Sequence, residues 1–441
     1  MRIALAAALL FLGPAVILPQ QVSQRELSLE EAIEEALAGN SDLAIAEARR
    51  EIAEKHRKAA ASPLWPQVMV GAGYVRSVDP VFAFGAKLRQ GTFGPEDLDI
   101  EALNNPAAVD DWSARIGVRW SLLDPTVWAG KSAAARGAEA AEWAAMRARE
   151  ATVLMTRMLY FRALMAEAQL ESAQATVGAA EATVASFRQR QERGLLTDAD
   201  LLQAEAELAG ARAAQAQAAR SRVDALQELG RHLGWGPDTL PRLTGTLAPP
   251  DSIAEREFDP RQRADVKARE ATADAAARAK SRADYAWFPA LDAFAEYATH
   301  SADAFDFAAD NWTVGLALRW TLFSGFARTS EIQRAGLERH VAEIEYDQAL
   351  RDAQTELDQA QRAVAASREA VEATLAAAEA AAAAEDLMRR RFDQGLATAA
   401  DLLQAEARAT AMRERSIVGL AAYQIAIAQL EFVRSQANEE S

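Results

Sequence analysis

Few residues in this chain have the types and spacing that chemistry requires. The four histidines, His56, His232, His300 and His340, lie far apart, and three of them fall in predicted helices, so we interpret them as surface or packing residues. Because the chain has no cysteine, it can form neither a disulfide nor a thiolate metal site, and it offers no cysteine nucleophile or lipid-attachment site. Neither a glycine-rich phosphate loop nor a serine nucleophile elbow is present in the sequence. We therefore expect a protein without catalytic residues, bound metal or cofactor.

The composition indicates long helices and excludes one class of partner. Half of the residues are hydrophobic but only 7% are aromatic, so the apolar content is mostly alanine and leucine, and glycine and proline number only 22 and 14. Such a composition is typical of long packed helices with few turns. The formal net charge of −16 leaves no basic excess to neutralise phosphates, so nucleic acid is not an expected partner.

The N-terminal segment, residues 1–22, is predicted to be a secretory signal peptide. Arg2 forms a short positive region, an apolar stretch follows from residue 3 to residue 12, and small and polar residues come after it. The alternative is a membrane anchor, which needs ~20 apolar residues, and this stretch is interrupted well before that length. We find no other segment that could span a membrane as a helix, so any later crossing must use strands.

The strongest internal pattern is a twofold repeat. Three segments recur in the same order, and the pairs are residues 42–67 with 265–290, 112–123 with 312–323, and 193–206 with 394–407. The offset falls from 223 to 200 residues after the first pair, which places about 23 extra residues between positions 67 and 112 of the first copy. A loop accommodates an insertion of that size more easily than a packed element does.

Each copy is predicted to contain a short helix, a strand, a loop, a second strand, a very long helix, a tight turn and another long helix. The first helix begins with a capping box of Ser28 and Glu31, and the next covers about residues 41–61. The longest helices are predicted over about residues 125–193 and 326–394, and ~68 residues give roughly 100 Å. Rods of that length do not fit one compact domain. A soluble coiled-coil rod is the alternative if the strands are ignored.

The strands alternate strictly between apolar and other residues, and this pattern argues against a soluble rod. In residues 112–122 and 312–322 every second residue is apolar, over eleven residues, which is the length of a membrane-spanning strand. We predict a lipid-facing set with aromatic girdles, formed by Trp112, Val118, Trp120, Trp312, Leu318 and Trp320, and a lumen-facing set formed by Arg115, Arg119 and Arg319. The alternative is a half-buried sheet in a soluble domain.

Four strands per chain cannot close a membrane barrel. Each strand above is preceded by a weaker one, near residues 68–74 and 291–297. About eight strands are the fewest that membrane barrels use, and an open edge in lipid would leave backbone groups unpaired. The chain must therefore associate through its sheet, and two copies give eight strands while three give twelve. A lumen lined by arginine, serine, threonine and glycine indicates a wet channel, which favours three copies.

A second repeated motif, G-L-x-T-x-x-D-L-L-Q-A-E-A, marks the turns between the long helices. Its glycine can take the left-handed position after a helix, and its threonine and aspartate form the capping box of the next helix. Helix capping on either side of a turn would therefore be enough to explain a single copy of the motif. Two copies at the ends of long rods, each with an exposed leucine, favour a functional tip.

Together, the opening segment LSLEEAIEEALAGNSDLAIA, the repeat, the strand pairs and both turn motifs resemble the outer-membrane efflux protein (TolC) family over nearly the whole mature chain. The resemblance implies a mainly helical protein with membrane strands. Four strands per protomer would form a trimeric twelve-stranded barrel in the outer membrane of a Gram-negative-type bacterium, continuous with a long coiled-coil barrel of helices in the periplasm. The resemblance also implies a passive export duct. Its closed tips would open when a periplasmic adaptor and an inner-membrane pump of the RND, ABC or MFS type dock. The implied partners are two further copies of the chain, this adaptor, this pump and outer-membrane lipid.

The resemblance also implies roles for individual residues. The tips that contact the adaptor correspond to Gly194, Leu195, Thr197 and Leu201 in the first copy and to Gly395, Leu396, Thr398 and Leu402 in the second. The periplasmic gate corresponds to Asp401 and its partner Asp200, with Arg390 and Arg391 as basic residues near enough to pair with them. Gln404 stands where some members have a second acidic residue, so the charge of the closed ring stays open. The missing N-terminal cysteine departs from the lipid-anchored branch of the family.

These expectations divide the chain into consecutive parts. They are the signal peptide (1–22), the N-terminal helices (23–63), the first strand pair with a long extracellular loop (64–124), the first periplasmic hairpin (125–236), a linker and helix (237–286), the second strand pair (287–324) and the second hairpin (325–441). The loop at 76–111 is expected to be a packed extracellular loop, although its aromatic residues could fold over the barrel mouth or bind an external ligand. From another class, a periplasmic scaffold or adaptor without a barrel is the alternative, whereas an enzyme has no candidate residues.

Overall fold

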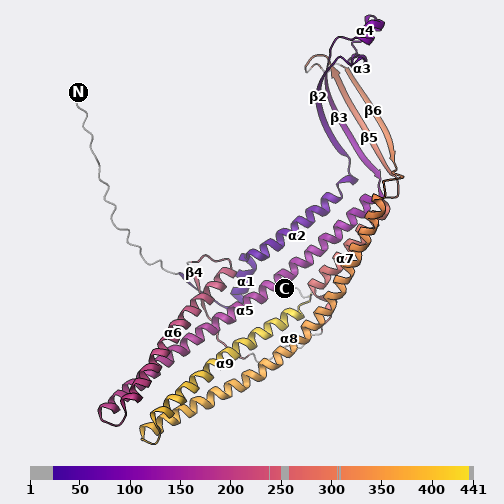
Figure 1. The fold of residues 1–441 in the computed structure, drawn as a ribbon. Helices are drawn as coiled ribbons and strands as arrows, with labels where there is room; N and C mark the ends of the chain where they lie inside the picture. The colour runs from indigo at the N-terminus through magenta and orange to yellow at the C-terminus, as the bar shows by residue number, and fades with distance from the viewer. Residues whose placement is uncertain (1–22, 238, 250–257, 305, 307–308, 437–441) are drawn as a thin grey trace, which may run out of the picture. The chain divides into compact units, whose positions relative to one another are not determined.

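The computed structural model describes residues 23–237, 239–249, 258–304, 306 and 309–436, so the predicted signal peptide lies outside the described residues. The helices in Figure 1 are α1 (Leu29–Gly39), α2 (Ser41–Ala60), α3 (Pro80–Gln90), α4 (Ile100–Asn104), α5 (Pro125–Glu192), α6 (Asp198–His232), α7 (Ala264–Tyr285), α8 (Ala327–Asp393) and α9 (Ala399–Arg434). The strands are β1 (Ser23–Leu27), β2 (Gln67–Ser77), β3 (Val109–Leu123), β4 (Thr239–Leu243), β5 (Ala290–Ser301) and β6 (Ala309–Arg319).

The chain divides into two compact units. One unit contains α1, α6 and α9, and the other contains most of α2, the four long strands and α7. The helices α5, of 68 residues, and α8, of 67 residues, contribute to both units, and each is about 100 Å long at 1.5 Å per residue. Their limits agree with the predicted ones to within a residue, because proline starts α5 and a glycine follows the end of each helix.

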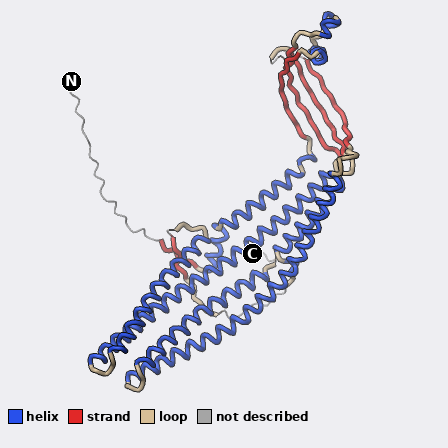
Figure 2. Tube along the Cα trace, in the orientation of Figure 1, coloured by secondary structure: helices blue, strands red, loops and turns tan. Residues whose placement is uncertain are grey.

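The four long strands form one antiparallel sheet in the order β2-β3-β5-β6 (Figure 2). Strand β3 pairs with both β2 and β5, and β5 pairs with both β3 and β6. Within the described residues, β2 and β6 each have one edge that pairs with no other strand. Such edges present unpaired backbone groups, which invite pairing with another chain.

The second predicted strand lies three residues earlier than its alternation suggested, and it keeps a length of eleven residues. The pattern continues to residue 322, but β6 ends at Arg319. Its partner β5 begins at Ala290, which lies opposite Arg319, so the residues that follow have no strand with which to pair. Strand β3 is longer than predicted and reaches Leu123, with a register shift near its end. Side-chain alternation therefore misplaced the ends of this strand, because pairing, and not alternation, sets where a strand ends.

A small two-stranded parallel sheet was not predicted. Strand β1 pairs with β4, which lies in the segment expected to be a linker. The pair helps to cover a core in which Leu27 and Tyr160 are almost fully buried, together with Leu226 and Leu229 of α6. The burial of side chains of this size stabilises the fold by about 1.5–3 kcal/mol each. Five-residue strands give too little alternation for a prediction from sequence.

The predicted extracellular loop is more structured than the expectation of a packed loop implied. It contains two helices, α3 and α4. Asp79 caps α3 by accepting a hydrogen bond from the backbone N–H of Phe82 at 2.7 Å, and Gly91 ends the helix with a φ of 68°. The 23 residues inserted relative to the second copy therefore form a folded element.

The C-terminal helix α9 corrects the expectation that no segment beyond the N-terminal one is apolar enough to span a membrane as a helix. By length and composition α9 alone, among the described helices, is apolar enough to cross a membrane. Several of its residues, including Ala421, Ile427 and Leu430, are nevertheless buried inside the chain. A packed core helix has the same composition, so this finding by itself indicates no membrane span.

Candidate functional site

The sheet has two chemically different faces, because residues paired in register share a face and alternate along each strand. The apolar face comprises Val68, Val70, Ala72, Tyr74, Trp112, Ala114, Ile116, Val118, Trp120, Ala293, Ala295, Tyr297, Trp312, Val314, Leu316 and Leu318. The opposite face carries Met69, Gly71, Gly73, Ser113, Arg115, Gly117, Arg119, Asp292, Phe294, Glu296, Ala298, Thr313, Gly315, Ala317 and Arg319. The predicted lipid-facing residues within the strands thus share the apolar face, and the three predicted lumenal arginines share the opposite face.

Large hydrophobic side chains on the apolar face are exposed. Val314, Leu316 and Leu318 of β6 are 63%, 67% and 68% accessible. In a half-buried sheet of a soluble domain, these residues would be covered by other parts of the chain. A contiguous exposed apolar surface of this kind indicates contact with lipid or with another protein.

The tryptophans at one end of the sheet make the same contact in both repeats. The indole N–H of Trp120 donates to the backbone carbonyl of Leu64 at 2.9 Å, and that of Trp320 donates to the carbonyl of Trp287 at 3.0 Å. Although Trp320 follows the end of β6, this bond places it equivalently to Trp120. An amphipathic ring with its polar N–H satisfied suits the boundary between apolar and polar surroundings.

Tyrosines make an equivalent contact near the other end of the sheet. The hydroxyl of Tyr74 donates to Asp110 at 2.6 Å, and that of Tyr297 donates to Asp310 at 3.1 Å. The ring of Tyr74 also lies 4.6 Å from that of Trp112, measured between centroids. Both ends of the apolar face thus carry aromatic residues with polar anchors, which is the arrangement of two interfacial girdles.

The other face combines charges with small residues. Arg319 forms an ion pair with Asp292 at 3.3 Å, and Arg115, Arg119 and Arg319 are all exposed. Phe294 lies over Gly315, where a Cβ would come within 2.6 Å of the ring, so any larger residue there would require the ring to move. A face with arginines, acids and glycines suits contact with water.

A buried polar cluster at one end of this face was not found by sequence reasoning. The Nδ1 of His300 lies 3.0 Å from Asp111, and the amide of Gln90 donates to the same carboxylate at 2.9 Å. All three side chains are less than 10% exposed. The histidine is therefore a packing residue, and only the sheet register brings it to Asp111, which lies 189 residues away.

The two turns of the hairpins have the predicted local structure. Gly194 and Gly395 have φ values of 70° and 77°, in the left-handed region. In both turns the threonine hydroxyl accepts a hydrogen bond from the aspartate N–H at 3.2 Å, and the aspartate accepts one from the threonine N–H at 3.0 Å. These capping boxes pair Thr197 with Asp200 and Thr398 with Asp401.

The predicted gate residues form contacts with residues close to them in the sequence. Hydrogen bonds from Thr398 hold the pKa of Asp401 below its usual range, with a smaller contribution from the charge of Arg391. Hydrogen bonds from Thr197 lower the pKa of Asp200 in the same way. Arg390 forms an ion pair with Asp386 at 2.6 Å, one helical turn before it, and not with Asp401.

The two turns pack on a shared hydrophobic core, which we call the tip core. It is formed by Val184, Phe187, Ala204, Phe392, Ala399, Leu402 and Leu403. The rings of Phe187 and Phe392 are 5.1 Å apart, and Leu402 is only 3% exposed. Leu195 and Leu396, in contrast, are 67% and 64% exposed. Of the predicted tip leucines, these two remain available to a partner, while Leu402 stabilises the tip from inside.

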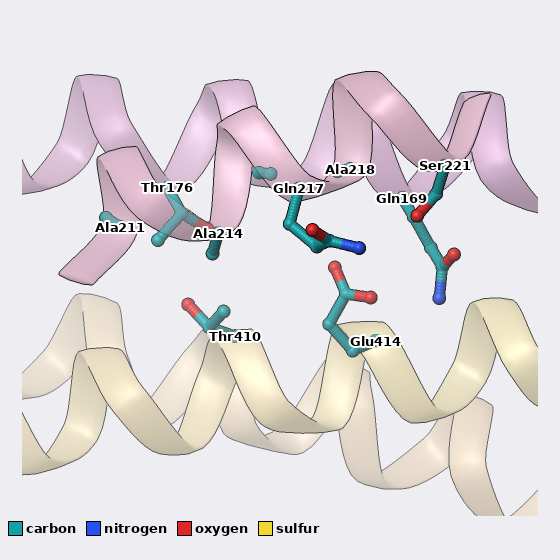
Figure 3. A pocket seen from close by; sticks show the side chains of 10 residues that line it. Gln169, Thr176, Ala211, Ala214, Gln217, Ala218, Ser221, Thr410 and Glu414 are labelled. Atoms are coloured by element: carbon teal, nitrogen blue, oxygen red, sulfur yellow. The ribbon is translucent and has the colours of Figure 1, made fainter. Parts of the chain in front are cut away.

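A groove of about 380 Å³ lies between the first hairpin and α9. Figure 3 shows the carboxylate of Glu414 on α9 directed toward Gln217 of α6 across it. The remaining lining is hydroxyl, amide and alanine side chains: Gln169, Ala173, Thr176, Ala211, Ala214, Ala218, Ser221 and Thr410. This lining lacks the paired nucleophile and base that catalysis requires. Among the described residues, no group of histidine and carboxylate side chains is placed to hold a metal ion.

The sequence matches the family model for "Outer membrane efflux protein" over residues 32–235 and 261–433. No protein of curated function matches the chain significantly.

Solved structures share the fold over almost its full length. A membrane protein from Pseudomonas aeruginosa is 22% identical, with a TM-score of 0.77, and the match covers 92% of this chain and 93% of that one. The outer membrane protein VceC from Vibrio cholerae is 21% identical, with a TM-score of 0.77 over 93% of this chain and 97% of its own. The Campylobacter jejuni CmeC outer membrane channel is 17% identical, with a TM-score of 0.78 over 93% and 87%.

Proposed function

Since the chain belongs to the outer membrane efflux protein family, we propose that it is the outer-membrane duct of a tripartite efflux or type I secretion system. Members of this family are channels and not enzymes, and the chain resides in the outer membrane and extends into the periplasm. In the proposed role it conducts substrates passively to the exterior from a periplasmic adaptor and an inner-membrane pump.

One observation carries the proposal: a four-stranded sheet with an exposed apolar face, a charged face and two edges that pair with no other described strand. In lipid these edges must be paired, because no water is present to satisfy their backbone groups. Additional copies of the same sheet would pair them, with β6 of one protomer beside β2 of the next. Three copies make a twelve-stranded barrel, which is wide enough to leave an aqueous lumen beside the arginines.

Native mass measurement in detergent tests this assembly directly. We expect three chains, with the β content retained. Matched substitutions in neighbouring residues of one strand test the faces on the same sample. Val118→Arg and Leu318→Arg should impair assembly, since a lipid-facing arginine near mid-bilayer costs about 2–4 kcal/mol, whereas Gly117→Arg and Ala317→Arg should be tolerated. A stable monomer with full β content, or equal tolerance on both faces, would overturn the proposed barrel.

We propose that the adaptor contacts the hairpin turns. The exposed pair Leu195 and Leu396 supports this, because isolated leucines at the ends of long helices leave apolar surface free for a partner. The turns are formed by Gly194, Gly395, Thr197 and Thr398. Leu402 belongs to the tip core, and Leu201 packs against it. Leu195→Asp with Leu396→Asp should reduce the adaptor captured by crosslinking in cells while the trimer persists. Unchanged capture would place the adaptor contact elsewhere.

We also propose that Asp401, with Asp200, contributes to a periplasmic gate. Its support is the position of each carboxylate beside a turn, which threefold assembly would repeat around one axis. Like charges brought together there repel unless a basic group or a cation lies between them. Such a ring would attract cations, and a cation or basic group that bridges the carboxylates would resist opening until a partner docks.

A further inference from the structure

The helix α3 packs on the charged face of the sheet, at the end away from α2 and α5. Its residues Ala83 and Ala86 are buried in a small cluster with Val109 of β3. Gln90, one turn further, donates to the backbone carbonyl of Asp110 at 2.7 Å and to the carboxylate of Asp111 at 2.9 Å. The side chain of Asp111 belongs to the charged face, since its neighbour Trp112 belongs to the apolar face.

The opposite side of α3 is an exposed apolar stripe. Val81, Phe84 and Leu88 recur at helical spacing and are 80%, 40% and 51% exposed. The buried set Ala83, Ala86 and Gln90 has the same spacing, displaced by half a turn. The stripe of Val81, Phe84 and Leu88 is therefore directed away from the sheet. Phe84 is partly covered by Phe93, but Val81 and Leu88 remain mostly exposed in the described part of the chain.

The proposed trimeric assembly determines which surface the stripe contacts. If the charged face lines the lumen, as the proposed function requires, a surface on α3 that is directed away from the sheet is directed toward the barrel axis. Threefold symmetry then brings the same stripe of each protomer toward the same axis. Apolar side chains facing a water-filled lumen are unfavourable, and mutual burial removes their surface from water.

We propose that the Val81–Phe84–Leu88 stripe is a contact surface between copies of this chain, and that three α3 helices meet to form an apolar plug at the outer mouth of the channel. The inference rests on the proposed trimeric barrel. The buried cluster of Gln90, Asp111 and His300 holds the helix in this orientation. The edge-to-face contact between Phe84 and Phe93, with centroids 5.0 Å apart, supports the stripe from the following loop.

The absence of cysteine makes this contact testable by single-cysteine crosslinking in outer membranes. Leu88→Cys and, independently, Val81→Cys should form disulfide-linked dimers under mild oxidation, because two thiols of each trimer can pair at the axis. Arg89→Cys is the matched control, since Arg89 is also exposed but lies about a quarter turn away from the stripe. Before oxidation, a bulky impermeant maleimide should label the thiol of the Leu88→Cys variant several-fold more slowly than that of the Arg89→Cys variant.

The same samples are measured by native mass, so two failures can be told apart. A trimer in which Leu88→Cys and Val81→Cys crosslink no better than Arg89→Cys would overturn the plug and leave the proposed duct intact. A protein that is not trimeric would overturn the duct and the plug together. Selective crosslinking and protection at residues 81 and 88 in the trimer would establish the contact.

Discussion

The two hairpin tips have the same turn motif but different surroundings, and the difference identifies which side of the tip the chain leaves open. Leu403 of α9 is 7% exposed, whereas its equivalent in the first repeat, Leu202 of α6, is 65% exposed. The ion pair of Arg389 with Glu406 is partly buried, but the equivalent pair of Arg188 with Glu205 is mostly exposed. The identical segment D-L-L-Q-A-E-A thus has different environments in the two repeats.

Packing within the chain explains this asymmetry. The start of α9 is covered by α5 of the other hairpin, as the hydrogen bond from Thr183 to Glu406 at 2.8 Å shows. Nothing in the described part of the chain covers Leu202 of α6 in the same way. In a ring of identical chains, Leu202 would therefore be available to the neighbouring protomer, while Leu403 is already buried within its own chain.

The largest expected effect is at the equivalent leucines. Leu403→Ala should destabilise the tip by about 2–5 kcal/mol, since it opens a cavity in the tip core, whereas Leu202→Ala should cost little in a single chain. Native-state hydrogen exchange of the first turns of α9 and α6 measures both effects locally. A small loss at Leu403 would contradict the packing. A comparable loss at Leu202 in the assembled protein would show that another chain covers it.

A smaller effect is expected at Arg190 and its equivalent, Arg391. Arg190 donates to the backbone carbonyl of Phe392 at 3.2 Å, pairs with Asp393 at 2.8 Å and lies over the ring of Phe392. Arg190→Ala should therefore cost about 1.5–3 kcal/mol, as is typical when a charged hydrogen-bond partner is lost. Arg391→Ala is the control, because that side chain is exposed. Proteolysis at the turns reports both losses, and equal sensitivity would refute the asymmetry.

The capping boxes, in contrast, should respond alike. Thr197→Val and Thr398→Val should each cost about 1 kcal/mol in the exchange of the first helical turn, because their hydrogen-bond lengths are the same.

The proposed gate predicts an effect of Asp401 on conduction as well as on stability. Asp401→Ala should raise single-channel current in planar bilayers and weaken block by multivalent cations, while Thr398→Val should leave that block unchanged. If Asp401→Ala lowers only thermal stability, capping is its whole role.

The smallest effect is a pH dependence at Glu406. Burial raises the pKa of this carboxyl above its usual value, despite the lowering influence of Thr183 and Arg389. The folded tip then binds a proton more readily than the unfolded chain, so its stability is highest at low pH and falls as pH rises from the usual glutamate pKa through the raised one. Glu406→Gln should remove this slope in hydrogen exchange between acidic and neutral pH. Glu205→Gln is the control, and an unchanged slope in Glu406→Gln would assign it to another group.

Much of this protein follows from its sequence because its patterns are local or repeated. Proline and glycine positions set the limits of α5 and α8, and each turn's capping box lies within four consecutive residues, Thr197 to Asp200 in one case. Alternation along the strands assigned Arg115 and Val118 to opposite faces, since side chains alternate wherever a strand forms. The twofold repeat strengthened each of these predictions, because an independent copy carried the same signal.

What the sequence alone did not determine depends on contacts between distant residues. The end of β6 is set by where β5 begins, and the cluster of His300 with Asp111 exists only because β3 and β5 pair in one register. The parallel pairing of β1 with β4 and the burial of Leu403 but not Leu202 likewise arise from packing across the chain. Local pattern specifies which element forms and which side is apolar. Only tertiary structure decides what covers that side, because burial depends on neighbours that are distant in sequence.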